Sequence, residues 1–170
     1  MSAILVRMEL EEEIMSVCTF FGHRDCPASV RPQLRMTLTE LIEHQSVDVF
    51  YVGNKGAFDR LVRSVLRELA QEYPHIRYAV VLERMPGRQN GDHPEDFSDS
   101  VLPEGIEKAP ARYAIVWRNR WMLRQADFVV TYVTHPGGGA AQFAELAAKQ
   151  GKTVLNLAEQ ETKPQPRARP

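Results

Sequence analysis

Short apolar segments alternate with amphipathic segments along most of the chain. The apolar segments are five to seven residues long and rich in valine and aromatic residues. Such runs favour strands that are covered on both faces of a sheet. The predicted strands are Met15–Phe21, Val47–Val52, Ile76–Leu82, Phe128–Val133 and Thr153–Leu157.

Between the apolar segments, hydrophobic residues recur three or four positions apart, as they do on one face of a helix. The clearest repeat lies between Gly56 and Pro74, where an apolar stripe runs from Phe58 to Leu69. The other predicted helices are Val30–Gln45, Arg112–Gln125 and Ala140–Gln150.

Strands that are separated by helices pair in parallel through right-handed crossovers. We therefore predict the α/β class: a single-domain, three-layer Rossmann-like sandwich over residues 1–160. Numbered along the chain, its five strands are expected in the order 3-2-1-4-5, with the first strand in the centre. The pattern does not decide whether residues 1–13 form a helix or an extra edge strand.

Two segments depart from this alternation. Residues 83–111 contain four prolines, three glycines and many acidic residues, which predicts a long irregular loop. The tail 161–170 has three prolines and is predicted to be disordered. An acidic cluster in the loop lacks a rigid metal-ligand spacing, so we expect a solvated loop and no metal site, with a lid over the pocket as the alternative. Its members are Asp92, His93, Glu95, Asp96 and Asp99.

Composition narrows the class of protein. Of 170 residues, 44% are hydrophobic and 25% are charged, which excludes a disordered chain, a coiled coil and a collagen-like repeat. The formal net charge of -1 and the lack of a concentrated basic stripe argue against a nucleic-acid partner. No apolar run approaches the roughly 20 residues of a membrane-spanning helix. We see no signal-peptide pattern, and Cys18 and Cys26 are too few for a disulfide framework, so we predict a cytoplasmic protein.

Three glycine-containing turns directly follow predicted strands. In open parallel sheets, ligands bind beyond the carboxyl ends of the strands where the strand order reverses. Glycine lets backbone N–H groups approach a phosphate or a ribose hydroxyl, and a helix that begins after the turn adds unpaired N–H groups. Each turn alone has an ordinary structural alternative, but their convergence on one sheet edge favours a binding site. The candidate ligand-binding residues are Gly22, His23, Arg24, Gly53, Asn54, Lys55, Pro136, Gly137, Gly138 and Gly139.

Four short motifs give the chain a resemblance to a known family. They are FFGHR at 20–24, YVGNKGAFD at 51–59, RNRWM at 118–122 and PGGG at 136–139. Their order and spacing over residues 15–157 resemble the SLOG superfamily, which includes the DprA/Smf proteins, the LOG phosphoribohydrolases and the YpsA-like proteins. The YpsA-like branch, where a GHR loop and an RNxxM helix are typical, is the most similar. The resemblance implies a Rossmann-like fold that binds a nucleotide or a nucleotide derivative at this sheet edge.

The resemblance to the LOG enzymes also implies site residues. Arg118 matches their catalytic arginine, and Asn119 is expected to line the pocket beside it. Their PGGxGTxxE signature is altered here, because Ala140-Ala141 replace Gly-Thr and Ala144 replaces the glutamate. Glu145 lies one residue later, about 100° further round a helix, and is the candidate catalytic carboxylate.

These differences leave two functions in view. The first is a sensor or binding module for a nucleotide or ADP-ribose-like ligand, with no other cofactor. The alternative is an N-glycosidase that acts on nucleoside monophosphates or NAD-like compounds, with Glu145 or Asp59 near the ribose. Folds of this kind are commonly homodimers, and a dimer is expected here by analogy.

Several side chains have two interpretations. Asp59 accepts a hydrogen bond from a ribose hydroxyl, or it only complements the dipole of its own helix. His23 contacts the ligand or only fixes its loop, and Lys55 binds phosphate or is simply solvated. Trp117 and Trp121 lie four residues apart on one helix and are expected in the core or in a dimer contact.

Overall fold

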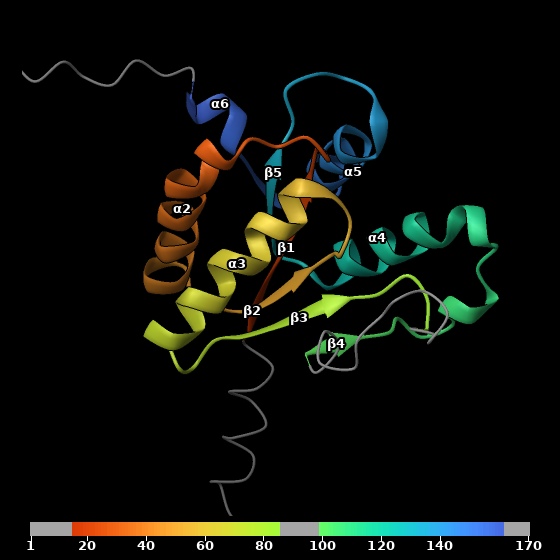
Figure 1. Ribbon diagram of the computed structural model, residues 1–170, viewed down its shortest axis with the longest axis horizontal. Helices are drawn as coiled ribbons and strands as arrows, with labels where there is room; N and C mark the ends of the chain where they lie inside the picture. The colour runs from red at the N-terminus through yellow and green to blue at the C-terminus, as the bar shows by residue number, and fades with distance from the viewer. Residues whose placement is uncertain (1–14, 86–98, 162–170) are drawn as a thin grey trace, which may run out of the picture.

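The computed structural model describes residues 15–85 and 99–161, which form one parallel sheet with helices on both faces (Figure 1). Six strands lie in the order β4-β3-β2-β1-β5-β6, and every pairing is parallel. The strands are β1 (Ser16–Gly22), β2 (Val47–Val52), β3 (Arg77–Val81), β4 (Ser100–Val101), β5 (Phe128–Tyr132) and β6 (Thr153–Asn156).

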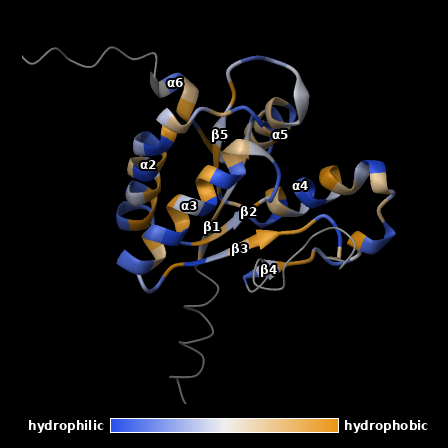
Figure 2. Ribbon diagram, in the orientation of Figure 1, coloured by the Kyte–Doolittle hydropathy of each residue, from blue (hydrophilic) through white to orange (hydrophobic). Residues whose placement is uncertain are grey.

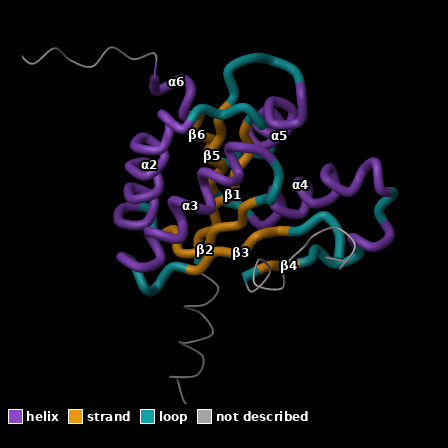
Figure 3. The backbone as a smooth tube through the Cα atoms, in the orientation of Figure 1, coloured by secondary structure: helices purple, strands orange, loops and turns teal. Residues whose placement is uncertain are grey.

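The helices form two layers (Figure 3). One face of the sheet is covered by α2 (Arg31–His44), α3 (Gly56–Glu72) and the short α6 (Leu157–Glu161). The other face is covered by α4 (Ala114–Gln125) and α5 (Gly138–Lys149). Short 3₁₀ helices are found at Ala28–Val30, Ile106–Lys108 and Ala111–Tyr113.

The α/β class and the order of the five predicted strands are confirmed. The sixth strand, β4, pairs with β3 at the sheet edge through Val80↔Ser100 and Val81↔Val101. It lies inside the segment that was predicted to be irregular. Two residues are too few to show the period of a strand, so hydrophobic patterning does not reveal them. The predictions for residues 1–13 and for the tail after Glu161 lie outside the described residues.

The helix after β5 begins two residues before its predicted start at Ala140. Glycine is a weak helix former, so the pattern assigned Gly138 and Gly139 to the preceding turn. In the structure both residues belong to the first turn of α5. This shift places the glycine run at the N-terminal end of the helix itself.

Two apolar clusters hold the layers together, one on each face of the sheet. Adjacent residues of a strand point to opposite faces, so Phe20 joins the cluster under α2 and α3 while Phe21 joins the cluster under α4 and α5. Figure 2 shows apolar residues on the strands and polar residues along the outer sides of the helices. Cys18 and Cys26 are both buried and are not joined in a disulfide, and the burial of Cys18 agrees with its prediction as a small apolar residue.

Within the described parts of the chain, no helix combines the length and the apolar character that a membrane span needs.

Candidate ligand-binding site

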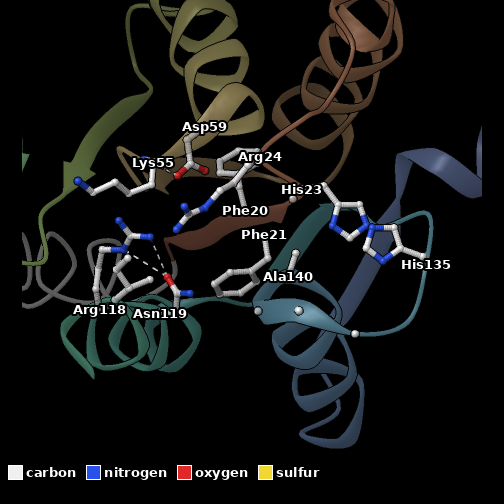
Figure 4. A pocket seen from close by; sticks show the side chains of 15 residues that line it. Phe20, Phe21, His23, Arg24, Lys55, Asp59, Arg118, Asn119, His135 and Ala140 are labelled. Atoms are coloured by element: carbon white, nitrogen blue, oxygen red, sulfur yellow. Dashed lines mark hydrogen bonds between the residues drawn. The ribbon is translucent and has the colours of Figure 1, made fainter. Parts of the chain in front are cut away.

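A cavity of about 300 Å³ lies at the carboxyl edge of the sheet, where the strand order reverses between β1 and β5. Its walls come from the end of β1, the loops after β1, β2 and β5, and the helices α3, α4 and α5 (Figure 4). The topology alone places it there, because parallel strands bring their following loops to one edge. The lining residues are Phe20, Phe21, Gly22, His23, Arg24, Lys55, Asp59, Ile115, Arg118, Asn119, His135, Gly137, Gly138, Gly139 and Ala140.

Most of the residues predicted for binding meet in this cavity. Gly22, His23, Arg24, Lys55, Arg118, Asn119 and the three glycines of residues 137–139 line it. Gly53 and Asn54 do not line the cavity but lie next to Arg118, which does. Asn54 accepts a hydrogen bond from Arg118, and Gly53 lies close to the Arg118 guanidinium. Pro136 lines a neighbouring hollow at the start of α5.

The glycine run at 137–139 leaves open space at the start of α5. Gly137 and Gly138 have φ angles of 97° and 82°, a backbone conformation that favours glycine. A Cβ added at any of the three positions would meet no atom within 4 Å. The N-cap residue of α5 is Gly137, which has no side chain to cap the helix, so within the described chain the first backbone N–H groups of α5 are available to an anion.

The glycines on the opposite side are crowded. A Cβ at position 22 would lie 2.1 Å from the ring of Phe58, which is itself buried. A Cβ at position 53 would lie 2.6 Å from a carboxylate oxygen of Asp59 and 3.0 Å from Arg118 Cζ. These two glycines were predicted as ligand contacts, and the structure shows that their missing side chains make room for the protein itself.

Arg118 is the centre of a polar network beneath the cavity. Its side chain is buried, and its Nη1 donates to Asn54 Oδ1 at 2.9 Å. Nε and Nη2 donate to Asn119 Oδ1 at 3.2 and 3.1 Å. Burial lowers the pKa of Arg118, although Asp59 and Glu83 oppose that shift, and a guanidinium remains charged. Arg118 is therefore a fixed cation in the floor of the cavity.

Asp59 brings a carboxylate to the same place. Its Oδ2 accepts the backbone N–H of Lys55 at 3.0 Å, so it caps the first turn of α3. Burial raises its pKa, while Arg118, the Lys55 N–H, Arg63 and Arg24 act in the opposite direction. Both interpretations of Asp59 thus remain, since it caps a helix and also lines the cavity.

Glu83 is a buried acid that sequence reasoning missed. One carboxylate oxygen lies 3.1 Å from Lys55 Nζ, and the other lies 3.7 Å from Arg118 Nη1. Burial alone would raise its pKa, but its own backbone N–H, Lys55 and Arg118 together lower the pKa below its ordinary value. Its position in the sequence could have identified it as a candidate site residue. Glu83 follows the third strand, just as Arg24 follows the first strand and Lys55 follows the second.

Glu145, the predicted catalytic carboxylate, does not line the cavity. It lies on α5 with 68% of its side chain exposed and pairs with Lys149 at 3.0 Å, one helical turn later. The neighbouring hollow that contains Pro136 also contains Glu145. Ala144, which stands at the position of the family's glutamate, does not line the cavity either.

The two tryptophans of α4 differ in environment. Trp121 packs edge-on against Tyr51 of β2, with ring centroids 5.1 Å apart. Trp117 is 39% exposed and does not line the cavity. Neither side chain offers a stacking platform inside the cavity, and a dimer contact at Trp117 stays a prediction.

Residues 15–85 and 99–161 contain no group of three or more side chains that could hold a metal ion. Four members of the predicted acidic cluster, Asp92, His93, Glu95 and Asp96, lie outside the described residues. Asp99 is described, and its carbonyl oxygen accepts the N–H of Val80 beside the edge strand β4.

Comparison with known proteins supports the fold through one solved structure. No protein-family model matches the chain, and no curated protein matches it in sequence. An X-ray structure of DNA processing protein A (DprA) from Streptococcus pneumoniae matches it in fold, with a TM-score of 0.60 and 14% sequence identity. The match covers 82% of this chain and 49% of that one, so the chain spans about half the length of DprA.

This similarity shows a shared fold. It agrees with the resemblance to the SLOG superfamily at that level, because the DprA/Smf proteins belong to the superfamily. The YpsA-like branch, the ligand, a dimer and the cytoplasmic location stay predictions.

Proposed function

We propose that this protein is a binding module for a nucleotide or a nucleotide derivative, with the ligand at the carboxyl edge of the sheet. One observation carries the proposal: the open N-terminus of α5 and the Arg24 side chain face the same cavity (Figure 4). Unpaired backbone N–H groups and a guanidinium are the two kinds of donor that proteins commonly offer to a phosphate group.

The distribution of charge supports an anionic ligand. Three cations, Arg24, Lys55 and Arg118, line the cavity, and Asp59 is a carboxylate that lines it with them. Lys55 and Arg118 are engaged by the buried Glu83. Within the described chain, no carboxylate forms an ion pair with Arg24. Arg24 is therefore the cation that remains for a ligand phosphate.

The rest of the cavity suits a sugar and a base. Asp59 and Asn119 are polar groups that can bond to ribose hydroxyls, and Phe20, Phe21 and Ile115 supply apolar surface. A nucleotide combines an anionic phosphate, a sugar with hydroxyl groups and a flat base, and the cavity offers residues that complement each of these three groups.

A thermal-shift screen tests the proposal. The purified protein is heated with nucleoside monophosphates, NAD and ADP-ribose, and each hit is analysed by chromatography for released base. A ligand that binds only the folded state stabilises it by about 2.7 kcal/mol at a hundredfold excess over its dissociation constant. A shift without base release supports a binding module, and no shift from any compound contradicts the proposal.

Variants connect the shift to the cavity. Arg24→Gln should abolish the shift, because it removes the cavity cation that forms no ion pair with a carboxylate of the described residues. Arg60→Gln is the matched control, since Arg60 is an exposed arginine of α3 that does not line the cavity. An equal loss in both variants would show that the shift depends on general surface charge.

One observation favours a second candidate function, hydrolysis of an N-glycosidic bond. Among the described residues that line the cavity, Asp59 is the only carboxylate. An oxocarbenium-like transition state needs such a group near the ribose. If base release is found, Asp59→Asn should abolish it while the thermal shift persists, and release that survives the substitution would exclude Asp59.

A further inference from the structure

Two of the histidines that line the cavity are stacked on each other. The rings of His23 and His135 are nearly parallel, with an interplanar angle of 4° and centroids 4.0 Å apart. His23 belongs to the loop after β1 and His135 to the loop before α5, and both line the cavity (Figure 4). The stack therefore joins the loop that carries Arg24 to the loop that carries the glycine run.

A hydrogen bond fixes the chemical form of His23. The backbone N–H of Thr134 donates to His23 Nε2 at 3.0 Å. A nitrogen that accepts a hydrogen bond holds a lone pair, so the neutral ring carries its proton on Nδ1. The backbone N–H of His23 also donates to Tyr132 O at 3.1 Å, which connects the loop after β1 to the last residue of β5.

We propose that this histidine pair is a pH-sensitive latch that holds the two phosphate-binding loops together only while His23 is neutral. A proton on Nε2 would point at the Thr134 N–H, so two donors would face each other and the bond would break. If His135 also carried a proton, two positively charged rings would be stacked with centroids 4.0 Å apart, and like charges at this distance repel. Acid therefore separates the Arg24 loop from the glycine run.

The groups around His23 determine the pH at which it takes up a proton and the latch opens. Burial lowers the pKa of His23, and His135 across the stack lowers it further, while Asp25 on its own loop acts in the opposite direction. The ring of Tyr132 of β5 meets the His23 ring edge-on, with centroids 6.3 Å apart. The loop of Thr134 has a separate anchor on β6, because Val133 exchanges hydrogen bonds with the Asn156 side chain. Only the His23 side of the connection is therefore expected to open.

The sign of the effect follows from the lowered pKa. An unfolded chain takes up the His23 proton near pH 6.5, whereas the folded chain takes it up only at lower pH. The latch is closed above this range and opens as the pH falls through the folded pKa. If only the closed form binds, affinity falls about tenfold for each pH unit below that value.

The first experiment needs no ligand. Nuclear magnetic resonance follows the imidazole titrations and the hydrogen exchange of the Thr134 amide between about pH 5 and 8. After correction for the intrinsic pH dependence of exchange, protection of Thr134 should fall with the His23 titration. Far-UV circular dichroism at each pH confirms that the fold persists. Protection that does not follow His23 overturns the proposal.

Two variants move the latch in opposite directions. His135→Phe keeps a flat ring in the stack but removes its charge, so the pKa of His23 should rise and Thr134 should open at higher pH. Asp25→Asn removes the opposite charge, so the opening should move to lower pH. A merely structural role for the stack predicts the same midpoint in both variants.

The consequence for binding rests on the proposed function, so it is tested separately. ADP-ribose is a suitable probe, because the charges of its two phosphate groups are constant over this range. Its affinity should fall at the pH where Thr134 opens and should follow the shifts of both variants. Affinity that ignores the Thr134 midpoint overturns control of the cavity by the latch. Absence of ADP-ribose binding at every pH, with Thr134 still responding, counts against that ligand and the proposed function and leaves the latch itself supported.

Discussion

The two sides of the cavity use glycine for different purposes. On one side, the space beside Gly22 and Gly53 is filled by Phe58, Asp59 and Arg118. On the other side, the space beside the glycines at 137–139 is open to the cavity. The same residue type at the same sheet edge therefore accommodates protein packing in one place and leaves room for a ligand in the other.

This difference also separates rigid from adaptable parts of the site. The crowded side is held by buried ion pairs and hydrogen bonds around Arg118. On the open side, the loop before α5 is joined to the loop after β1 by the stack of His23 and His135 and by the Thr134 N–H bond to His23, and it is joined to β6 by the side chain of Asn156. We therefore expect substitutions on the crowded side to change stability and those on the open side to change binding.

The largest effect should come from Arg118→Leu. This substitution leaves the buried carboxylates of Asp59 and Glu83 without their shared cation. Removing one partner of a buried ion pair typically destabilises a protein by about 4 kcal/mol. Urea denaturation measures the loss, and Arg120→Leu, at an exposed position of the same helix, should change stability by less than about 0.5 kcal/mol. Equal losses would show that the helix, and not the network, is at fault.

Gly22→Ala should have the next largest effect. The new methyl group would overlap the buried ring of Phe58, and such overpacking costs about 2 kcal/mol. Gly139→Ala is the matched substitution on the open side, where it should leave stability unchanged or raise it by up to about 1 kcal/mol, since alanine favours helix. Denaturation curves and thermal shifts with ADP-ribose compare the pair. The contrast between the two sides fails if Gly139→Ala destabilises the fold or leaves binding intact.

Asp59→Asn should change how stability depends on pH. Because burial raises the pKa of Asp59 above its ordinary value of 3.8, the folded wild type gives up this proton at a higher pH than the unfolded chain. Its stability therefore falls as the pH rises through that window. The amide oxygen of asparagine can still accept the Lys55 N–H, so the variant should gain stability relative to wild type across the window. Denaturation at a series of pH values measures the difference, and a constant difference contradicts the raised pKa.

Glu145→Gln should have the smallest effect. Its pair with Lys149 is exposed, and pairs of this kind are worth less than about 0.5 kcal/mol. Ligand-induced thermal shifts should also be unchanged, since Glu145 does not line the cavity. A lost shift, or a lost base-release activity, would restore Glu145 as a functional residue.

The pattern of apolar and polar residues was enough to predict the class of fold and the edge of the sheet at which the cavity lies. Apolar runs such as Phe128–Val133 and the helical stripe after Gly56 depend only on local periodicity, so five strands and the intervening helices followed from them. The predicted strand order agrees with the structure, but local periodicity alone did not require it. The position of Arg24, Lys55 and the glycine run at one edge followed from the parallel connections. Local patterns carry this information because strands and helices are periodic.

The contacts that those residues make depended on packing between distant parts of the chain. The two kinds of glycine look the same in the sequence, and neither position 144 nor position 145 of α5 lines the cavity. Glu83 gained its role from Lys55 and Arg118, which are distant in sequence and adjacent in space. Contacts across the sheet edge depend on packing between separate elements, so a pattern that repeats within one element cannot record them.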